Sequence, residues 1–134
     1  MGQAVTGKPT KGALAKPGDR ALFLVGHDTN LTNVAGLLNL TWIADGRRDD
    51  TPPGSALVFE LWRSRTGKED FVRLYYTAQT LEQMRAATVL TLANPTDRVP
   101  LFIPGCSRQD FSCAWPEFSQ LLLRMLDAHA VSEK

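Results

Sequence analysis

The feature that most constrains the fold is a short apolar run leading through a glycine into a polar turn. Residues 21–25 read Ala-Leu-Phe-Leu-Val and are followed by Gly26. A run that is apolar at every position favours a strand buried on both faces of a sheet. After the turn, apolar residues recur at helical spacing and predict an amphipathic helix: Leu31, Val34, Ala35 and Leu38. Strand, tight turn and helix in this order indicate an α/β fold.

The middle of the chain has the pattern of a loop followed by a hairpin. The polar segment 44–54 ends in Pro-Pro-Gly, a triplet that stops regular structure, and it predicts a loop. Two runs rich in β-branched and aromatic residues then flank a turn that contains Thr-Gly-Lys. They predict an antiparallel hairpin with strands at 56–62 and 71–76.

The last part of the chain predicts two helices and a weaker strand. Thr80 and Gln83 have the spacing of a capping box, which indicates that a helix begins there. Pro100 interrupts an apolar segment and demotes it to a sheet edge. The predicted elements are a short helix, an edge strand and a final helix, at 81–87, 99–103 and 116–128.

Length and composition predict one globular unit with a solvated beginning. The 134 residues are 43% hydrophobic, which is enough for a core. Residues 1–19 are rich in Gly, Pro and Lys without an apolar period, and predict a flexible leader or linker before a domain at 20–134. The net charge of +1 argues against a nucleic-acid partner, and no apolar run is long enough for a membrane span.

The candidate functional residues are His27 and Asp28, where the predicted strand turns into the predicted helix. The N-terminus of a helix offers free backbone N–H groups and the positive end of a dipole, which suits an anion. An imidazole there could hold a phosphate oxygen, and a carboxyl group beside it could give a proton to a leaving group. The alternative is purely structural, with Asp28 capping the helix and His27 packing in the turn. The residues themselves leave both interpretations open.

Other polar residues offer less chemistry. His129 falls at the end of the last predicted helix, where a cation complements the dipole, and we expect a structural role. No ligand spacing indicates a zinc site, and no metal or cofactor is expected. Cys106 and Cys113 are seven positions apart, and such a short loop is readily closed by a disulfide. A disulfide would imply an oxidising compartment, whereas two free thiols would suit the cytosol.

Four segments in order then resemble one family. The sequence Leu-Phe-Leu-Val-Gly-His-Asp-Thr-Asn over 22–30 resembles the second catalytic motif of the histidine acid phosphatases, in particular the bacterial periplasmic phytases and glucose-1-phosphatases. The segments 51–63 and 79–85 resemble the parts of that family which follow, and 105–113 resembles its C-terminal disulfide loop. The resemblance covers the chain from about residue 20 to the last helix.

The resemblance implies the hydrolysis of phosphomonoesters, phytate in particular, through a phosphohistidine and without a metal. His27 would bind the phosphate, Asp28 would be the proton donor, and Thr29 would lie beside the substrate. The fold implied is the C-terminal portion of the family's α/β domain, in a periplasmic or secreted enzyme.

The family's nucleophile is missing from this sequence. In the family it stands in an N-terminal Arg-His-Gly-x-Arg-x-Pro motif, and no Arg-His-Gly occurs here. The chain is therefore expected to be the C-terminal part of such an enzyme, inactive alone and active with the N-terminal part as its partner. The alternatives are a non-catalytic fragment that self-associates through an exposed sheet edge, or part of a glucose-1-phosphatase or other sugar phosphatase.

Overall fold

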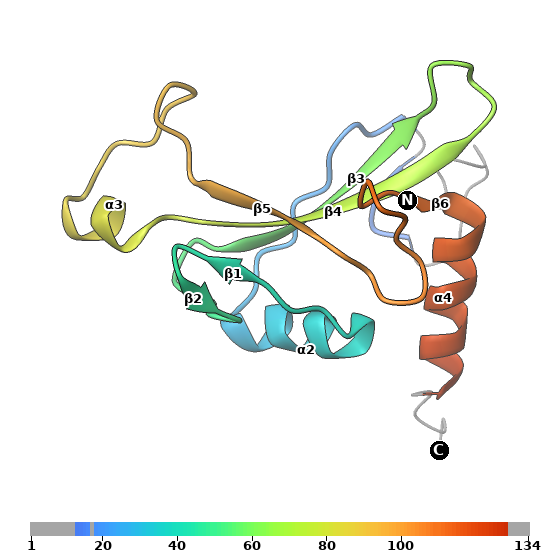
Figure 1. Cartoon of the computed structure of the whole chain (residues 1–134), viewed down its shortest axis with the longest axis horizontal. Helices are drawn as coiled ribbons and strands as arrows, with labels where there is room; N and C mark the ends of the chain where they lie inside the picture. The colour runs from blue at the N-terminus through green and yellow to red at the C-terminus, as the bar shows by residue number, and fades with distance from the viewer. Residues whose placement is uncertain (1–12, 17, 129–134) are drawn as a thin grey trace.

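A twisted antiparallel sheet forms the centre of the computed structural model, which describes residues 13–16 and 18–128 (Figure 1). The long hairpin strands β3 and β4 pair with each other, and β4 pairs in addition with β5 and with the short β6. The strand bounds are β3 Ala56–Arg63, β4 Asp70–Ala78, β5 Asp97–Leu101 and β6 Cys113–Ala114. The predicted hairpin is confirmed, and each of its strands is longer than expected.

The two faces of the sheet differ in the way that period-two alternation requires. On β4, alternate residues are almost completely buried: Val72, Leu74, Tyr76 and Ala78. The opposite face carries charged and aromatic side chains, where the Arg98 guanidinium lies over the Tyr75 ring at 3.7 Å. Glu60 forms an ion pair with Arg98 on the same face. One face of the sheet is therefore the core, and the other is polar and aromatic.

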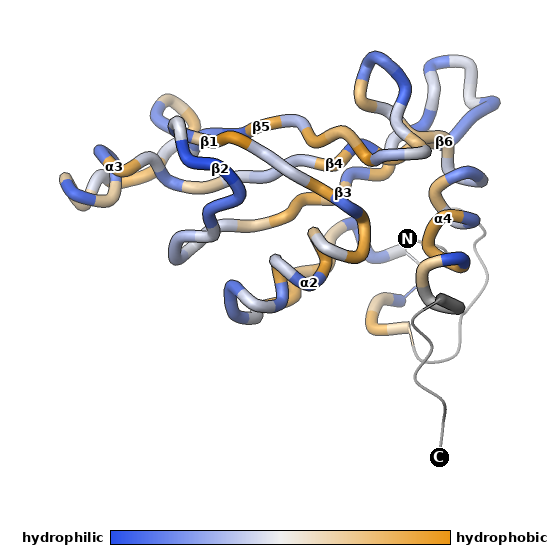
Figure 2. The backbone as a smooth tube through the Cα atoms, turned by 60° about the horizontal axis from the view of Figure 1, so that its bottom comes forward, coloured by the Kyte–Doolittle hydropathy of each residue, from blue (hydrophilic) through white to orange (hydrophobic). Residues whose placement is uncertain are grey.

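Two helices, α2 (Asp28–Leu38) and α4 (Trp115–Ala128), complete the core on the apolar face of the sheet. They lie on the same side of the strands, and hydrophobic stretches run along β3 to β5 and along α4 (Figures 1 and 2). Ala35 and Leu38 anchor α2, whereas Phe118 and Leu121 anchor α4. The predicted α/β fold class and both amphipathic helices are confirmed.

The prediction of a loop at 44–54 is wrong in part, because the segment includes a small hairpin. Strands β1 (Ile43–Ala44) and β2 (Arg47–Arg48) pair antiparallel around Asp45 and Gly46. Both turn residues have positive φ angles, 50° and 69°. Asp-Gly is the preferred sequence for a two-residue hairpin turn with this backbone.

The predicted capping box at the short helix is confirmed, although the helix ends earlier than expected. The helix α3 is Leu81–Arg85, and the Thr80 hydroxyl accepts a hydrogen bond from the Gln83 N–H at 3.1 Å. Ala87 has a φ of 46°, which takes the backbone out of the helix. The edge position of the proline strand is also confirmed, because β5 pairs with β4 through Pro100 and with no other strand among the described residues.

The prediction of a buried strand at 21–25 is wrong in this structure. These residues belong to no helix or strand, and their side chains are exposed. They form the blue segment that leads into α2 in Figure 1. A strand that is apolar on both faces needs paired neighbours, and no strand of the described residues pairs with this segment.

Some predictions lie outside the described residues. The leader at 1–19 is described only at 13–16, 18 and 19, where no helix or strand forms, and the prediction of two parts divided at residue 20 remains untested. His129 is not among the described residues. Within the part of the chain that the structure describes, none of the helices is long and apolar enough to cross a membrane.

Candidate active site

His27 and Asp28 lie at the solvent-exposed start of α2, as the sequence predicts. His27 is the N-cap residue with extended backbone angles, φ −101° and ψ 170°, and Asp28 is the first helical residue. Both are exposed, and among the described residues neither forms an ion pair. Because the other end of the helix is anchored in the core through Leu38, these two residues are held at the surface on a fixed element.

The turn before α2 is shaped by a contact between Gly26 and Asn30. The Asn30 side-chain oxygen accepts a hydrogen bond from the His27 backbone N–H at 2.8 Å. A β-carbon at Gly26 would lie only 2.7 Å from that oxygen and 3.1 Å from the carbon that bears it. A glycine is needed here because of this close approach. The sequence Gly-His-Asp-Thr-Asn therefore forms a compact turn that fixes the His27 backbone.

The Asp28 carboxylate is held by the backbone of the next residue. Its Oδ1 atom accepts a hydrogen bond from the Thr29 N–H at 2.7 Å, and the His27 carbonyl accepts one from the Asn30 N–H at 3.0 Å. Carboxylate and carbonyl acceptors thus occupy first-turn N–H groups that could also face an anion. Both interpretations of His27 and Asp28 remain compatible with this geometry, since a ligand phosphate could replace the carboxylate oxygen at Thr29.

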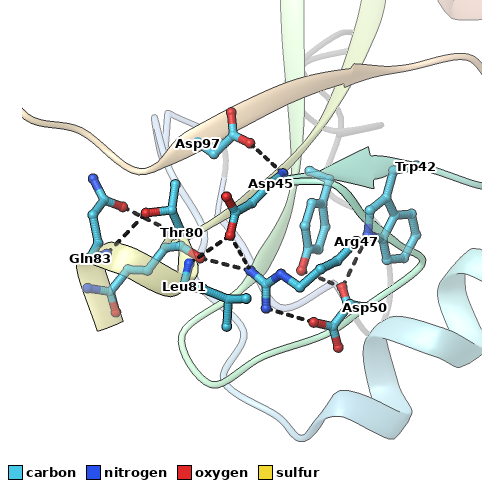
Figure 3. Close-up of polar contacts among 10 residues, drawn as sticks. Trp42, Asp45, Arg47, Asp50, Thr80, Leu81, Gln83 and Asp97 are labelled. Carbon is cyan, nitrogen blue, oxygen red and sulfur yellow. Dashed lines mark hydrogen bonds and ion pairs between the residues drawn. The ribbon is translucent and has the colours of Figure 1, made fainter. Parts of the chain in front are cut away.

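A polar network between the β1–β2 hairpin and α3 centres on Arg47 (Figure 3). Its guanidinium donates to the Asp50 carboxylate at 2.7 Å and to the Gln79 carbonyl at 3.2 Å. It also lies 3.5 Å from Asp45 Oδ2, which accepts the Leu81 N–H at 2.7 Å. The network therefore ties the β1–β2 hairpin to the start of α3.

The same network reaches the core through aromatic side chains. The Asp50 carbonyl accepts hydrogen bonds from the Tyr76 hydroxyl at 2.6 Å and from Trp42 Nε1 at 3.2 Å. The two rings stack with centroids 4.5 Å apart. Burial raises the pKa of Tyr76 above its ordinary value. Trp42 is thus buried in the core, whereas Trp62 on β3 is 46% exposed.

The predicted disulfide is present between Cys106 and Cys113, with Cα atoms 5.3 Å apart. Ion pairs connect its loop to the hairpin, from Arg108 to Glu69 at 2.7 Å and from Arg73 to Asp110 at 3.3 Å. The Arg108 guanidinium lowers the pKa of Glu69 through a hydrogen bond and its charge. The loop is therefore attached to the sheet by electrostatics as well as by the covalent link.

The described residues contain no group of three or more His, Cys, Asp or Glu side chains that could hold a metal ion. Two surface hollows have walls that do not include His27, Asp28 or Thr29, and one of them runs along α2 at Thr32, Asn33, Gly36 and Leu37. The other, of about 370 Å³, lies between the tip of the β3–β4 hairpin and the start of α4, with Lys68, Arg108 and Glu117 in its wall. The site at His27 and Asp28 is therefore an open surface within this chain and not an enclosed pocket.

Comparison with known proteins assigns the chain to a family. Residues 8–77, which include the His-Asp turn, match the histidine phosphatase superfamily (branch 2). This chain belongs to that superfamily. The match supports the resemblance that the four sequence segments indicate.

Characterised relatives are phosphatases of two kinds. Phytase AppA of Escherichia coli (strain K12) is 41% identical over 103 residues, which are 75% of this chain and 24% of that protein. A glucose-1-phosphatase of Providencia rettgeri is 30% identical over 108 residues, 79% of this chain and 26% of that protein. The chain thus spans about a quarter of the length of the curated relatives that it matches.

Solved structures of phytases share the fold. The apo form of the Hafnia alvei phytase is 39% identical, with a TM-score of 0.77 over 88% of this chain and 29% of that one. The same enzyme in complex with myo-inositol hexakis sulphate is 42% identical, with a TM-score of 0.69 over 75% of this chain and 25% of that one. The architecture of the present chain is therefore that of a portion of a phytase-like fold.

Proposed function

We propose that this chain supplies the phosphate-binding and proton-donating residues of a phytase-like phosphomonoester hydrolase. The observation that carries the proposal is the position of His27 and Asp28, side by side and exposed at the start of a core-anchored helix. They occupy this position in a chain of the histidine phosphatase superfamily. The structural alternative, a simple helix cap, explains the carboxylate contact to Thr29 but gives no use for an exposed histidine beside it.

The proposed role of His27 is to hold the phosphoryl group. Its imidazole donates a hydrogen bond to a phosphoryl oxygen, the Thr29 N–H donates another once the Asp28 carboxylate releases it, and the helix dipole adds its positive end. Thr29 follows Asp28 in the first turn of the helix, and its hydroxyl adds an uncharged hydrogen-bond donor to the phosphoryl group. Such donors stabilise the charge that develops on the oxygens during transfer.

The proposed role of Asp28 is proton transfer in two steps. In the first step the bond from phosphorus to the leaving oxygen breaks, its electron pair stays on that oxygen, and the Asp28 carboxyl gives it a proton. In the second step the Asp28 carboxylate takes a proton from water, whose oxygen bonds to phosphorus as the bond to the nucleophile breaks. General acid–base assistance of this kind contributes roughly 10²–10⁴-fold in rate.

The nucleophile must come from elsewhere, since no Arg-His-Gly motif occurs in the sequence. We propose that a histidine in the N-terminal part of the enzyme attacks phosphorus and forms a phosphohistidine. The matched relatives are about four times as long as their shared segment, which leaves ample chain for such a part. The 134-residue chain alone is accordingly proposed to be inactive.

Phytate is the proposed substrate, and glucose 1-phosphate is the second candidate. The relative described as a phytase is 41% identical, whereas the two described as glucose-1-phosphatases are 30% and 34% identical. A periplasmic or secreted location is proposed because the Cys106–Cys113 disulfide suits an oxidising compartment.

A chimera tests the function directly. This chain replaces the matching segment of the Hafnia alvei phytase, and hydrolysis of phytate and of glucose 1-phosphate is measured at acid pH. The expected result is turnover of phytate that falls about 100-fold or more with Asp28→Asn. The control is Glu82→Gln, an exposed acidic residue on α3, which should leave turnover unchanged. A chimera that folds but turns over neither ester would contradict the proposal.

A further inference from the structure

The Asn30 side chain reaches back from the third residue of α2 to the residue that caps the helix. Its Oδ1 atom accepts a hydrogen bond from the His27 N–H at 2.8 Å, and the Asn30 N–H donates one to the His27 carbonyl at 3.0 Å. One residue therefore engages both polar groups of the His27 backbone. Asn30 is exposed, as His27 and Asp28 are, so this contact lies at the surface where a substrate would bind.

A carboxylate at position 30 would serve this cap as well as the amide does. The contact needs only an oxygen that accepts the His27 N–H, and capping boxes often have an acidic residue at this position. The helix dipole also favours negative charge in the first turn. The stability of α2 therefore does not require an uncharged side chain at position 30.

The capping box of α3 shows what an amide can add to such a contact. Gln83 Oε1 accepts a hydrogen bond from the Thr80 N–H at 3.0 Å. Gln83 Nε2 then donates to the Pro95 carbonyl at 2.8 Å and to Asn94 Oδ1 at 3.3 Å, which a carboxylate could not do. Asn30 Nδ2 has no such partner within the part of the chain that the structure describes. The fold of this chain thus uses only the oxygen of the Asn30 amide.

We infer that Asn30 is a positioning residue of the proposed phosphate site and that its lack of charge determines the affinity for anionic substrates. The inference rests on the proposed function and adds a residue that controls substrate binding. The amide oxygen holds the His27 backbone, and the amide nitrogen leaves two N–H donors and no negative charge beside a phosphoryl group bound by His27. A carboxylate here would repel the phosphoryl oxygens, and most strongly for a substrate with several phosphate groups.

Asn30→Asp separates the capping role from the role of charge, because it keeps the acceptor oxygen and adds a negative charge. In the isolated chain, its urea midpoint should equal or exceed that of the unmutated chain. In the chimera with the Hafnia alvei phytase, the affinity for myo-inositol hexakis sulphate is measured by titration calorimetry. This anion has been solved in complex with that phytase and has no phosphate ester to hydrolyse. Its affinity should fall about 10-fold or more at about pH 6.5.

The pH dependence of this loss identifies its cause. Sulphate esters stay ionised throughout the acid range, so the charge of the probe is constant. An introduced aspartate is ionised at about pH 6.5 and largely protonated at about pH 3, where the loss should shrink to less than about threefold. Titration of His27 and Asp28 is common to both chimeras and cancels when their affinities are compared at the same pH.

Asn33→Asp is the matched control for the added charge. It makes the same change at an exposed position of the same helix, about 4.5 Å further from the N-terminus along the helix axis. The affinity for the probe should fall less than about threefold at either pH. An equal loss in the two variants would overturn the inference, because any negative charge on α2 would then have the same effect.

Other outcomes would also overturn the role of Asn30. These are a lower urea midpoint for Asn30→Asp, an affinity within about twofold of the unmutated chimera at about pH 6.5, and a loss of the same size at both pH values. Each would show that the charge of the side chain is not what matters at this position.

The binding assay needs no turnover, so this inference and the proposed function can fail separately. A chimera that loses affinity as predicted but hydrolyses neither ester would support the role of Asn30 and contradict the proposed function. A chimera that hydrolyses phytate and binds the probe equally well with Asn30→Asp would overturn the role of Asn30 alone. An unmutated chimera that folds but does not bind the probe would contradict both.

Discussion

The Asn30 side-chain oxygen and the His27 backbone N–H are joined by a 2.8 Å hydrogen bond across the start of α2. The bond holds the backbone of the candidate phosphate-binding residue in place without using its imidazole. It depends on Gly26, because the Asn30 side chain occupies the space that a β-carbon would need. The turn therefore orders the main chain of the site and leaves its functional groups exposed.

Gly26→Ala should lower the free energy of unfolding by about 1 kcal/mol, because the new methyl group displaces Asn30 and breaks this cap. Gly36→Ala is the matched control within the same helix, since no atom lies within 4 Å of its β-carbon position. It should raise stability by about 0.5–1 kcal/mol through lower chain entropy. Urea denaturation measures both variants, and equal effects would contradict the proposed role of the glycine.

Arg47→Met should destabilise the chain by about 2 kcal/mol, because it leaves the Gln79 carbonyl and the Asp50 carboxylate without the Arg47 donor and removes the ion pair with Asp45. Arg48→Met is the neighbouring control, since its side chain is 75% exposed and, among the residues that the structure describes, pairs only with Asp49. Its cost should be within about 0.5 kcal/mol of zero. Similar losses for the two variants in thermal unfolding would show that the network does not depend on Arg47.

Replacing both Cys106 and Cys113 by serine should lower stability by about 2 kcal/mol, as expected for a short closed loop. A reducing agent should produce the same loss in the natural chain and no further loss in the double variant. Unfolding curves recorded with and without the reductant test this. Insensitivity of the natural chain to the reductant would contradict a stabilising disulfide.

Acid should weaken the attachment of the disulfide loop to the hairpin. Arg108 lowers the pKa of Glu69, and Asp110 has a lowered pKa because of hydrogen bonds from Ser112 and then because of Arg73. Carboxylates with lowered folded-state pKa values contribute stability above their unfolded-state pKa, and this contribution is lost as the pH falls below about 4. These groups are exposed, so the effect is small and falls with salt.

Arg108→Gln tests this dependence. The urea midpoint of the variant should fall less than that of the natural chain between about pH 6 and pH 3. Parallel curves for the two proteins would exclude the Arg108–Glu69 pair as a source of acid sensitivity.

The sequence was informative where one element determines its own structure. The β-branched and aromatic runs of the hairpin, the capping box at Thr80 and the seven-residue spacing of the cysteines each report a local preference, and each prediction is confirmed. The β1–β2 hairpin was missed because its strands are two residues long, although Asp45-Gly46 carried the turn signal.

The segment 21–25 shows the opposite case. Its composition specifies a buried strand, yet burial depends on strands that must pair with it, and the described residues do not provide them. For the same reason the sequence placed His27 and Asp28 at the start of a helix but could not supply the rest of the site. The position of a residue in a helix follows from the local sequence. Its surroundings are formed by residues that lie far away in the sequence.

The most direct test of Asp28 as the proton donor is the leaving-group dependence of its variant in the phytase chimera. Asp28→Asn should reduce phytate hydrolysis by about 100-fold or more, because an alkoxide leaves poorly without a proton. With 4-nitrophenyl phosphate, whose phenolate leaves without protonation, the loss should be less than about 10-fold. Equal losses for the two esters, or no loss for phytate, would contradict the proton-donor role.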